Sequence, residues 1–274
     1  MDDQATRASR FLAMHHGSSP LLLPNPWDAG SARLFEWLGF EAVATTSSGM
    51  AAARGRLDGS VEREEALLHA AAIVAATSLP VSADLENGFG DDPERVGETV
   101  RLALEAGLAG CSIEDSAPGA PQPIYERGQA EERMAAAAEA AHSGPVHLVL
   151  TGRAENYLHG RPDLADTIVR LEAYQRAGAD VLYAPGLTKL ADIASVVAAV
   201  DRPVNVLARP GGPTVPELAE VGVARVSVGG ALCFAALGAV VEAATELRDA
   251  GTYNFFARAA MGIDAARSAF ADGE

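Results

Sequence analysis

The sequence predicts an α/β fold: a single (β/α)₈ TIM-type barrel over residues 1–274, with an extra C-terminal helix. Eight short apolar runs alternate with helix-like segments, and strict alternation of this kind implies parallel strand pairing. Eight such units in about 250 residues match the size of this barrel. The rival fold, an open doubly wound sheet, would carry a GxGxxG fingerprint after an early strand, and the sequence has none.

The predicted strands are the eight apolar runs, taken in chain order. They are LLLPN (21–25), AVATTS (42–47), PVSADLE (80–86), GCSIED (110–115), HLVLTGRAE (147–155), VLYAPG (181–186), PVNVLA (203–208) and RVSVGG (225–230). The segments between them, such as DPERVGETVRLALEAG and DLADTIVRLEAYQRAG, open on an acidic residue that suits a helix N-cap. Both segments end in Ala-Gly, a common helix stop, and the next strand begins within a few residues.

Two helical segments follow the eighth predicted strand. The first is CFAALGAVVEAATELRDAG (233–251), and the second, residues 252–274, is more than the barrel needs. In the second segment Ile263, Ala266 and Phe270 recur at helical spacing. This helix either packs on its own barrel as an ordinary terminal helix or is covered by a neighbouring subunit, which would make 252–274 an oligomerisation helix.

The composition limits the partners and the location of the protein. A formal net charge of −16 and a pI near 4.7 disfavour binding to nucleic acids and to anionic membrane surfaces. No apolar run approaches the ~20 residues of a membrane helix, and the first residues lack the pattern of a secretory signal. We therefore expect a cytoplasmic protein without a nucleic-acid or membrane partner, in which Cys111 and Cys233 are buried free thiols.

The polar residues at the carboxyl ends of the predicted strands are the candidate site, because such barrels carry their chemistry there. They are Thr46, Ser47, Ser48 and Gly49 after strand two, Asp84 and Glu86 after strand three, Glu114 and Asp115 after strand four, Arg153 and Glu155 after strand five, and Asn205 and Arg209 after strand seven. Three or four carboxylates that face one opening repel each other unless a cation holds them. Oxygen ligands of this kind favour Mg²⁺ or Mn²⁺ over zinc.

Some of these acidic residues have a simpler explanation. A single acidic strand end is usually a helix N-cap or part of a solvated loop, and we prefer this interpretation for Asp91, Asp92 and Asp115. Three converging acidic strand ends are harder to explain in that way. Lys189 is the only lysine among the 21 basic residues, and it follows strand six rather than standing on it. This position disfavours a Schiff-base aldolase.

Five stretches of the sequence carry a resemblance to a known family. They are NPWDAGSARLFEWLGFEAVATTSSGMAAARGRLDG, LPVSADLENGFG, GCSIED, GRAEN and ELAEVGVARVSVGGALCFAALGA. Together they resemble the isocitrate lyase and phosphoenolpyruvate mutase superfamily over nearly the whole chain. The resemblance implies a barrel with bound Mg²⁺, or Mn²⁺. It also implies a small 2-oxo acid substrate, or the matching 2-hydroxy acid, in which a C–C or P–C bond breaks to give a pyruvate-like enolate.

The resemblance also implies roles for residues at the strand ends. The metal would be held, partly through water, by Asp84, Glu86 and Glu114. The substrate carboxylate would be held by Arg153 and the amides of Ser48, Gly49 and Met50, with Asp58 close to the reacting centre and Asn205 as a further candidate contact of the substrate. Members of this superfamily exchange a terminal helix and pair dimers into tetramers. The resemblance therefore favours a homo-oligomer, a dimer of dimers, with the last helix swapped between subunits.

One loop departs from the superfamily pattern. SAPGAPQPIYERGQAEER (116–133), after strand four, lacks the catalytic cysteine of the superfamily's lyases and the lysine of its mutases. Its candidate polar contacts are Gln122, Tyr125 and Arg127, with Tyr125 the candidate acid or base. A reaction that needs no acid on this loop fits best, such as decarboxylation of oxaloacetate, because the leaving CO₂ needs no proton. The alternatives are cleavage of a 2-hydroxy diacid with Tyr125 or a water as acid or base, a P–C bond reaction, and a non-catalytic 2-oxo-acid-binding protein.

Overall fold

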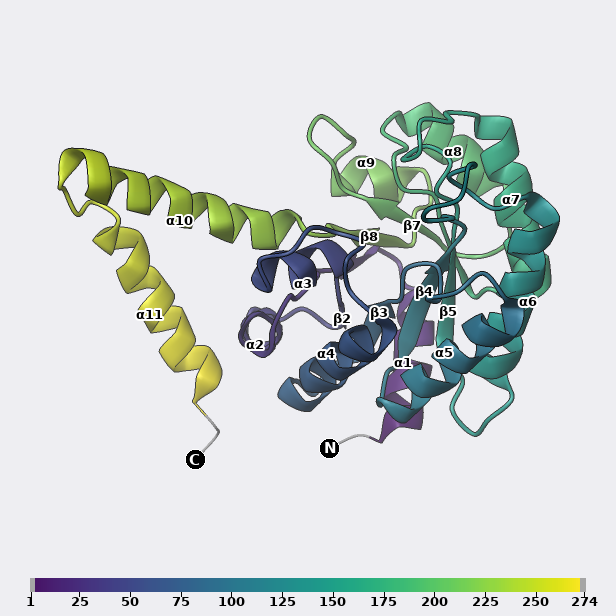
Figure 1. Cartoon of the computed structure of the whole chain (residues 1–274), viewed down its shortest axis with the longest axis horizontal. Coiled ribbons are helices and arrows are strands. Elements are labelled where there is room, and N and C mark those ends of the chain that lie inside the picture. The colour runs from purple at the N-terminus through teal and green to yellow at the C-terminus, as the bar shows by residue number, and fades with distance from the viewer. Residues whose placement is uncertain (1–2, 272–274) are drawn as a thin grey trace.

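A computed structural model describes residues 3–271, and all eight predicted strands form in it (Figure 1). Their bounds are β1 (Leu21–Leu23), β2 (Val43–Ala44), β3 (Val81–Asp84), β4 (Gly110–Glu114), β5 (Val149–Arg153), β6 (Val181–Tyr183), β7 (Val204–Leu207) and β8 (Arg225–Ser227). Residues 1, 2 and 272–274, which the predicted domain and the predicted C-terminal helix include, lie outside the described residues.

The strands form one parallel sheet that curves into a barrel. Their order is β1-β8-β7-β6-β5-β4-β3-β2, so each strand from β2 to β7 pairs with the next strand in the sequence, and β1 pairs with β8. The remaining seam lies between β1 and β2, where the Ala44 amide donates to the Pro24 carbonyl at 3.1 Å. The predicted TIM-type barrel is therefore confirmed.

Helices follow the strands as the pattern predicted. Their bounds are α1 (Gln4–Met14), α2 (Ala29–Trp37), α3 (Ser47–Ala53), α4 (Arg63–Ala76), α5 (Pro93–Glu105), α6 (Arg127–His142), α7 (Leu164–Ala177), α8 (Leu190–Ala199), α9 (Val215–Glu220), α10 (Ala231–Ala250) and α11 (Phe256–Phe270). The predicted caps form: Asp92 and Asp163 accept amide hydrogen bonds at the starts of α5 and α7, and Gly178 ends α7 with a φ of +111°. No helix within residues 3–271 is long and apolar enough to cross a membrane.

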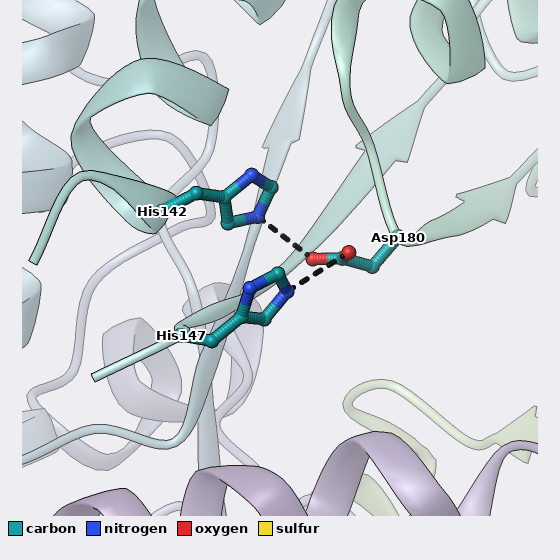
Figure 2. A group of neighbouring side chains, drawn as sticks. All are labelled: His142, His147 and Asp180. Atoms are coloured by element: carbon teal, nitrogen blue, oxygen red, sulfur yellow. Dashed lines mark hydrogen bonds and ion pairs between the residues drawn. The ribbon is translucent and has the colours of Figure 1, made fainter. Parts of the chain in front are cut away.

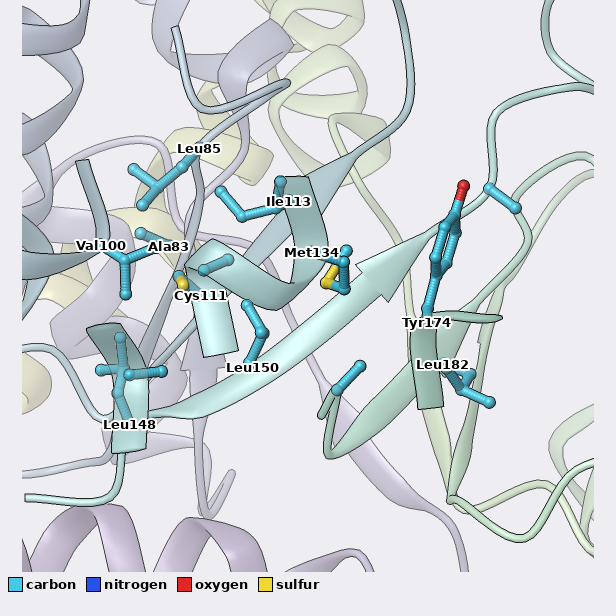
Figure 3. Close-up of a cluster of buried hydrophobic side chains, with 14 of the residues drawn as sticks. Ala83, Leu85, Val100, Cys111, Ile113, Met134, Leu148, Leu150, Tyr174 and Leu182 are labelled. Carbon is cyan, nitrogen blue, oxygen red and sulfur yellow. The ribbon is translucent and has the colours of Figure 1, made fainter. Parts of the chain in front are cut away.

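The core lies between the strands and the surrounding helices. Figure 3 shows part of it, where Leu150 and Leu182 of adjacent strands lie near Met134 of α6 and Tyr174 of α7. Cys111 is buried in this cluster as a free thiol, as predicted, and Cys233 is also buried and free.

Helix α1 covers the end of the barrel at which the strands begin (Figure 1). Its Phe11 is fully buried and packs against Gly110, the first residue of β4. A Cβ atom at Gly110 would lie 2.8 Å from a ring carbon of Phe11, so only glycine allows this approach. The opposite end of the barrel, where the strands finish, is left for the candidate site.

Helices α10 and α11 form an arm that leaves the barrel (Figure 1). Cys233 is the only buried residue of α10, and α11 has none. The chain reverses near Gly251, and the end of α11 returns to α2, where the guanidinium of Arg33 lies 5.7 Å from the ring centroid of Phe270. The extra helix predicted within 252–274 forms as α11, and α10, which precedes it, leaves the barrel as well. Helical periodicity identifies an apolar face but does not tell which surface covers it.

Candidate functional site

A cavity of about 210 Å³ lies at the carboxyl ends of the strands. Seven of the candidate residues line it: Thr46, Ser47, Ser48, Asp58, Asp84, Arg153 and Asn205. They come from β3, β5, β7 and the segments after β2, which the barrel topology brings to one opening. Further lining residues that the sequence analysis did not select include Asn25, Tyr183, Arg225 and Ser227.

Arg153 is the central cation of this opening. Its Nη1 atom lies 3.1 Å from Glu114 and 3.5 Å from Asp84, and its Nε atom donates to Glu155. The guanidinium carbon lies 5.3 Å from the ring centroid of Tyr183. Although burial works against the charged form, the neighbouring carboxylates raise the pKa of Arg153 well above its usual value. One permanent positive charge is therefore shared among three carboxylates.

Glu114 is a predicted metal ligand that sits beside Arg153. It is held by Ser116, whose hydroxyl donates to Oε1 at 2.5 Å. Burial raises the pKa of Glu114 to about 8, against the lowering effect of Arg153. The neighbouring charges of Glu155 and Asp84 add to the rise. Arg153 alone does not offset the effects of burial and of the acidic neighbours on this carboxylate. A further cation would therefore stabilise its charged form.

Glu86 has the least satisfied carboxylate of the site. Its Oε1 atom is buried without a hydrogen-bond partner, and its backbone φ is +48°, which is uncommon for a residue other than glycine. Burial, followed by the charges of Asp84 and Asp58, raises its pKa to about 7. A buried acceptor without a hydrogen-bond donor, on a residue with an unfavourable backbone conformation, is typical of a side chain that is positioned to bind a ligand.

The chemistry of these donors suits a divalent metal with oxygen ligands. Asp84 interacts with the charges of Glu86 and Glu114, neither of which lines the cavity, and the structure adds Glu155 beside Glu114. Asp84 itself is oriented by the Ser47 amide, which donates to Oδ2 at 3.3 Å. All these donors are carboxylate oxygens, the set that Mg²⁺ and Mn²⁺ prefer.

The predicted amide cradle at residues 48–50 is only partly at the cavity. Ser48 lines it, but the amides of Gly49 and Met50 donate to Thr46 within the first turn of α3, at 3.4 Å and 3.0 Å. Met50 is buried in the core behind this turn. Gly49 and Met50 do not line the cavity, because α3 begins at Ser47, the last residue of the strand predicted over 42–47, and uses their amides itself.

Tyr125, the predicted acid or base, lies outside the cavity. Its hydroxyl donates to Asp91 at 2.5 Å and accepts from Asn87 at 3.0 Å, and its ring lies 4.1 Å below the guanidinium carbon of Arg133. Burial and the bond to Asp91 raise its pKa to about 12. This tyrosine anchors the loop after β4 through these contacts.

Asp115 is also not what the sequence analysis preferred. It is buried rather than solvated, and it accepts from Arg170 at 2.9 Å, from the Tyr174 hydroxyl at 2.6 Å and from the Glu155 amide at 2.7 Å. These contacts fix the start of the segment that carries Glu155. Asp115 is therefore a positioning residue beneath the site.

Arg225 is a second cation that lines the cavity, and it has no carboxylate among its hydrogen-bond partners. It donates to Asn205 at 2.9 Å, to Thr151 at 3.0 Å and to Nε2 of His15 at 3.1 Å. Burial lowers its pKa to about 10, so it remains charged at neutral pH. Alternation along β8 places it on the same face as Ser227, a signal that would have identified it in the sequence.

His15 must be neutral to hold Arg225. Because arginine can only donate, Nε2 of His15 accepts, and its proton sits on Nδ1, which donates to the Phe11 carbonyl at 2.8 Å. Burial, and then the charge of Arg225, lowers the pKa of His15 from 6.5 to about 3. The contribution of His15 to stability is therefore fully present above pH 6.5 and is lost as pH falls through the folded value of about 3.

We expect His15→Gln to remove part of the acid sensitivity of the fold. Glutamine can still accept from Arg225 but does not titrate. Between pH 6.5 and 3 the wild type should lose up to several kcal/mol more than the variant, because one pKa unit corresponds to about 1.4 kcal/mol. Urea unfolding at a series of pH values measures this difference. The exposed neighbour His16, changed to Gln, is the control, and equal slopes for all three proteins would contradict the assignment.

The family model described as phosphoenolpyruvate phosphomutase matches residues 11–248. The chain belongs to this family. Its relatives include 2-methylisocitrate lyase of Escherichia coli K12 and 2,3-dimethylmalate lyase of Eubacterium barkeri, so the resemblance read from the sequence is confirmed at the level of the phosphoenolpyruvate mutase and isocitrate lyase superfamily.

Three further relatives cover most of the chain. A solved structure from Burkholderia cenocepacia J2315, provisionally described as a lyase/mutase, is 54% identical with a TM-score of 0.95, covering 99% of this chain and 98% of that one. The uncharacterised protein Rv1998c of Mycobacterium tuberculosis H37Rv is 32% identical, over 87% and 89% of the two chains. Oxaloacetate acetylhydrolase in complex with oxalate is 25% identical with a TM-score of 0.84, over 96% and 98%.

Proposed function

We propose that this protein is a Mg²⁺-dependent carbon–carbon lyase for a small 2-oxo or 2-hydroxy dicarboxylic acid, with oxaloacetate decarboxylation as the reaction that fits best. One observation carries the proposal. Asp84 lines the cavity beside Arg153, Glu114 contacts the same arginine, and Glu86, whose charge interacts with that of Asp84, keeps a buried oxygen without a partner. Mn²⁺ is the natural substitute, since it accepts the same ligands.

The charges at the cavity support an anionic substrate in spite of the net charge of −16. Arg153 and Arg225 both line the cavity, and a guanidinium is the preferred bidentate partner of a carboxylate. The cavity volume of about 210 Å³ is below the roughly 300–1,000 Å³ of pockets for drug-sized ligands. A small acid with two carboxylates matches both the size and the two cations.

The residues support a division of roles in which the metal supplies positive charge for the developing enolate oxygen. Asp84, Glu86 and Glu114 would hold it. Arg153 would bind and orient the substrate carboxylate, and Ser48 and Asn205 would contact the substrate from the other side of the cavity. Asp58 lines the cavity and interacts with Glu86, so it lies close to the proposed metal ligands.

Decarboxylation fits best because it does not require a general acid on the loop after β4. When the bond to the leaving carboxylate breaks, its electron pair passes into the enolate and CO₂ departs without a proton. The contacts of Tyr125 with Asp91 and Asn87 turn its hydroxyl away from this role. Two relatives, oxaloacetate acetylhydrolase and an oxaloacetate decarboxylase, act by name on the same diacid. Lys189 is the N-cap residue directly before α8 and does not line the cavity, which disfavours a Schiff base.

The test is consumption of oxaloacetate by the full-length protein, measured against Mg²⁺ alone. Turnover to pyruvate above this background supports the proposal. A panel with 2-methylisocitrate, 2,3-dimethylmalate and phosphonopyruvate separates decarboxylation from the other C–C cleavages and from a P–C bond reaction. If oxalate binds in the presence of Mg²⁺ and no member of the panel is consumed, the protein is a binding protein and the lyase proposal is wrong.

We further propose that the arm of α10 and α11 holds a homo-oligomer, a dimer of dimers in the cytoplasm. Its exposed apolar side chains include Phe234, Val240, Val241, Tyr253, Phe256, Met261 and Ile263. A monomer would keep this surface in water. Covering several hundred Å² of it by a second copy would contribute roughly 5–10 kcal/mol before association costs, at ~25 cal/mol per Å².

Charges on the arm should break this assembly. We expect Val240→Glu with Val241→Glu to lower the mass measured by light scattering, because these side chains are 63% and 65% exposed on the free arm and would be buried in the assembly. Truncation after Gly251 should act in the same direction. Leu68→Glu is the control, since Leu68 is 72% exposed on α4. An unchanged mass for both arm variants would show that the arm is not the contact.

A further inference from the structure

Two histidines and an aspartate meet at the end of the barrel where the strands begin (Figure 2). His142 lies in the last turn of α6, His147 precedes β5, and Asp180 precedes β6. Nε2 of His142 lies 3.0 Å from Oδ2 of Asp180, and Nε2 of His147 lies 3.0 Å from Oδ1. The substrate cavity is at the other ends of the same strands, so this cluster has no part in the proposed reaction.

The two imidazole rings are arranged as a pair. They are stacked with centroids 4.1 Å apart and planes 7° from parallel, and both turn the same nitrogen toward Asp180. Within residues 3–271, neither Nδ1 atom has a protein hydrogen-bond partner. Each ring can therefore carry its proton on Nδ1 and leave the lone pair of Nε2 free for an ion.

Asp180 is fixed by the backbone before any ion arrives. Its Oδ2 atom accepts from the Leu150 amide of β5 at 2.9 Å, and the residue is 7% exposed. A ligand held in this way is preorganised, because a hydrogen bond outside the donor set sets its orientation. Oδ1 has no such bond to the backbone. The histidines, in contrast, are accessible, with 26% and 43% of their side chains exposed for His142 and His147.

The distances suit joint ligation with small movements. An ion with bonds of about 2.0–2.2 Å to nitrogen and oxygen keeps tetrahedral ligand atoms about 3.3 Å apart. The three donor atoms here lie within 4.8 Å of one another, and both rings are partly exposed to solvent. We propose that His142, His147 and Asp180 form a separate binding site for a divalent transition metal ion such as Zn²⁺, with water completing its coordination.

The donor set separates this site from the one at the substrate cavity. Two imidazoles and one carboxylate suit Zn²⁺, Co²⁺ and Ni²⁺, whereas Mg²⁺ requires oxygen ligands. The nearby Cys111 is no donor, because burial raises the pKa of its thiol to about 12. An ion at this place would join the end of α6 to the starts of β5 and β6, and its effect would be on the stability of the barrel.

The test is calorimetric titration of the full-length protein with Zn²⁺ in an excess of Mg²⁺. We expect one step that is weakened at least tenfold in His142→Ala and in His147→Ala, since loss of even an outer partner of a metal ligand costs about 10- to 100-fold. Zn²⁺ should also raise the thermal midpoint of the wild type but not of these variants.

Two matched variants make the result specific. His16→Ala removes an exposed histidine elsewhere, and Asp84→Ala alters the substrate cavity, so both should keep the Zn²⁺ step. If the two cluster variants bind Zn²⁺ like the wild type, or if the wild type shows no such step, the cluster is a hydrogen-bonded clasp and the proposal is wrong.

Discussion

Replacing Asp84 with alanine is expected to lower kcat/KM for the substrate by at least about 10³-fold. Stabilisation of an enolate oxygen by a metal ion is worth several kcal/mol, and about 4 kcal/mol corresponds to a factor of 10³. Asp84 is the proposed ligand that both lines the cavity and contacts Arg153, so its loss affects the metal and the cation together. Steady-state kinetics with and without added Mg²⁺ measure the effect.

Chelation gives the same test without a mutation. EDTA should abolish activity in the wild type, and Mg²⁺ or Mn²⁺ should restore it. Asp92→Ala is the matched control, because this aspartate caps α5 and its side chain bonds to the Glu94 amide. It should lose a little stability and retain its activity. Full activity in metal-free buffer, or equal losses in the two aspartate variants, would show that the carboxylates at the cavity hold no catalytic ion.

Arg153→Lys is expected to weaken substrate binding by about 10- to 100-fold. Lysine keeps the positive charge but loses the planar fork that binds a carboxylate through two hydrogen bonds. Hydrogen bonds to charged groups are worth about 1.5–3 kcal/mol, and 1.4 kcal/mol is a factor of ten. Titration with oxalate in the presence of Mg²⁺, on the folded fraction of each protein, measures the change.

The competing explanation is that Arg153 is only a structural partner of its carboxylates. In that case the lysine variant would unfold at a lower denaturant concentration and bind oxalate as the wild type does. Arg209→Lys serves as the control, since Arg209 also follows β7 at this end of the barrel but is exposed and does not line the cavity. It should change neither quantity.

The barrel and much of its opening could be predicted because local patterns decide them. Strand length, acidic N-caps such as Asp92 and the glycine stop at Gly178 are encoded by neighbouring residues. Parallel strands then bring their carboxyl ends together whatever the details of packing. This is why the sequence alone predicts that Asp84, Arg153 and Asn205 share one opening.

The errors have a common physical origin, which is contact between segments far apart in the sequence. Asp115 looks like a cap or a loop residue until Arg170 and Tyr174 reach it from α7. Tyr125 looks available until Asp91 and Arg133 enclose it. None of these contacts leaves a periodic signal in the sequence, so residue type and spacing could not distinguish a positioning residue from a reactive one.

Because helix α1 covers the end of the barrel at which the strands begin (Figure 1), the amino terminus matters for how the protein is prepared. Phe11 closes the barrel from below, and His15 of the same segment holds Arg225, whose guanidinium is part of the cavity surface. Proteolysis or an affinity tag that displaces residues 4–16 would uncover the start of the barrel and remove His15, one of the three neutral acceptors of Arg225. The amino-terminal segment is thus a structural part of a pocket that opens on the far side of the molecule, and a shortened chain is not an equivalent reagent for kinetics.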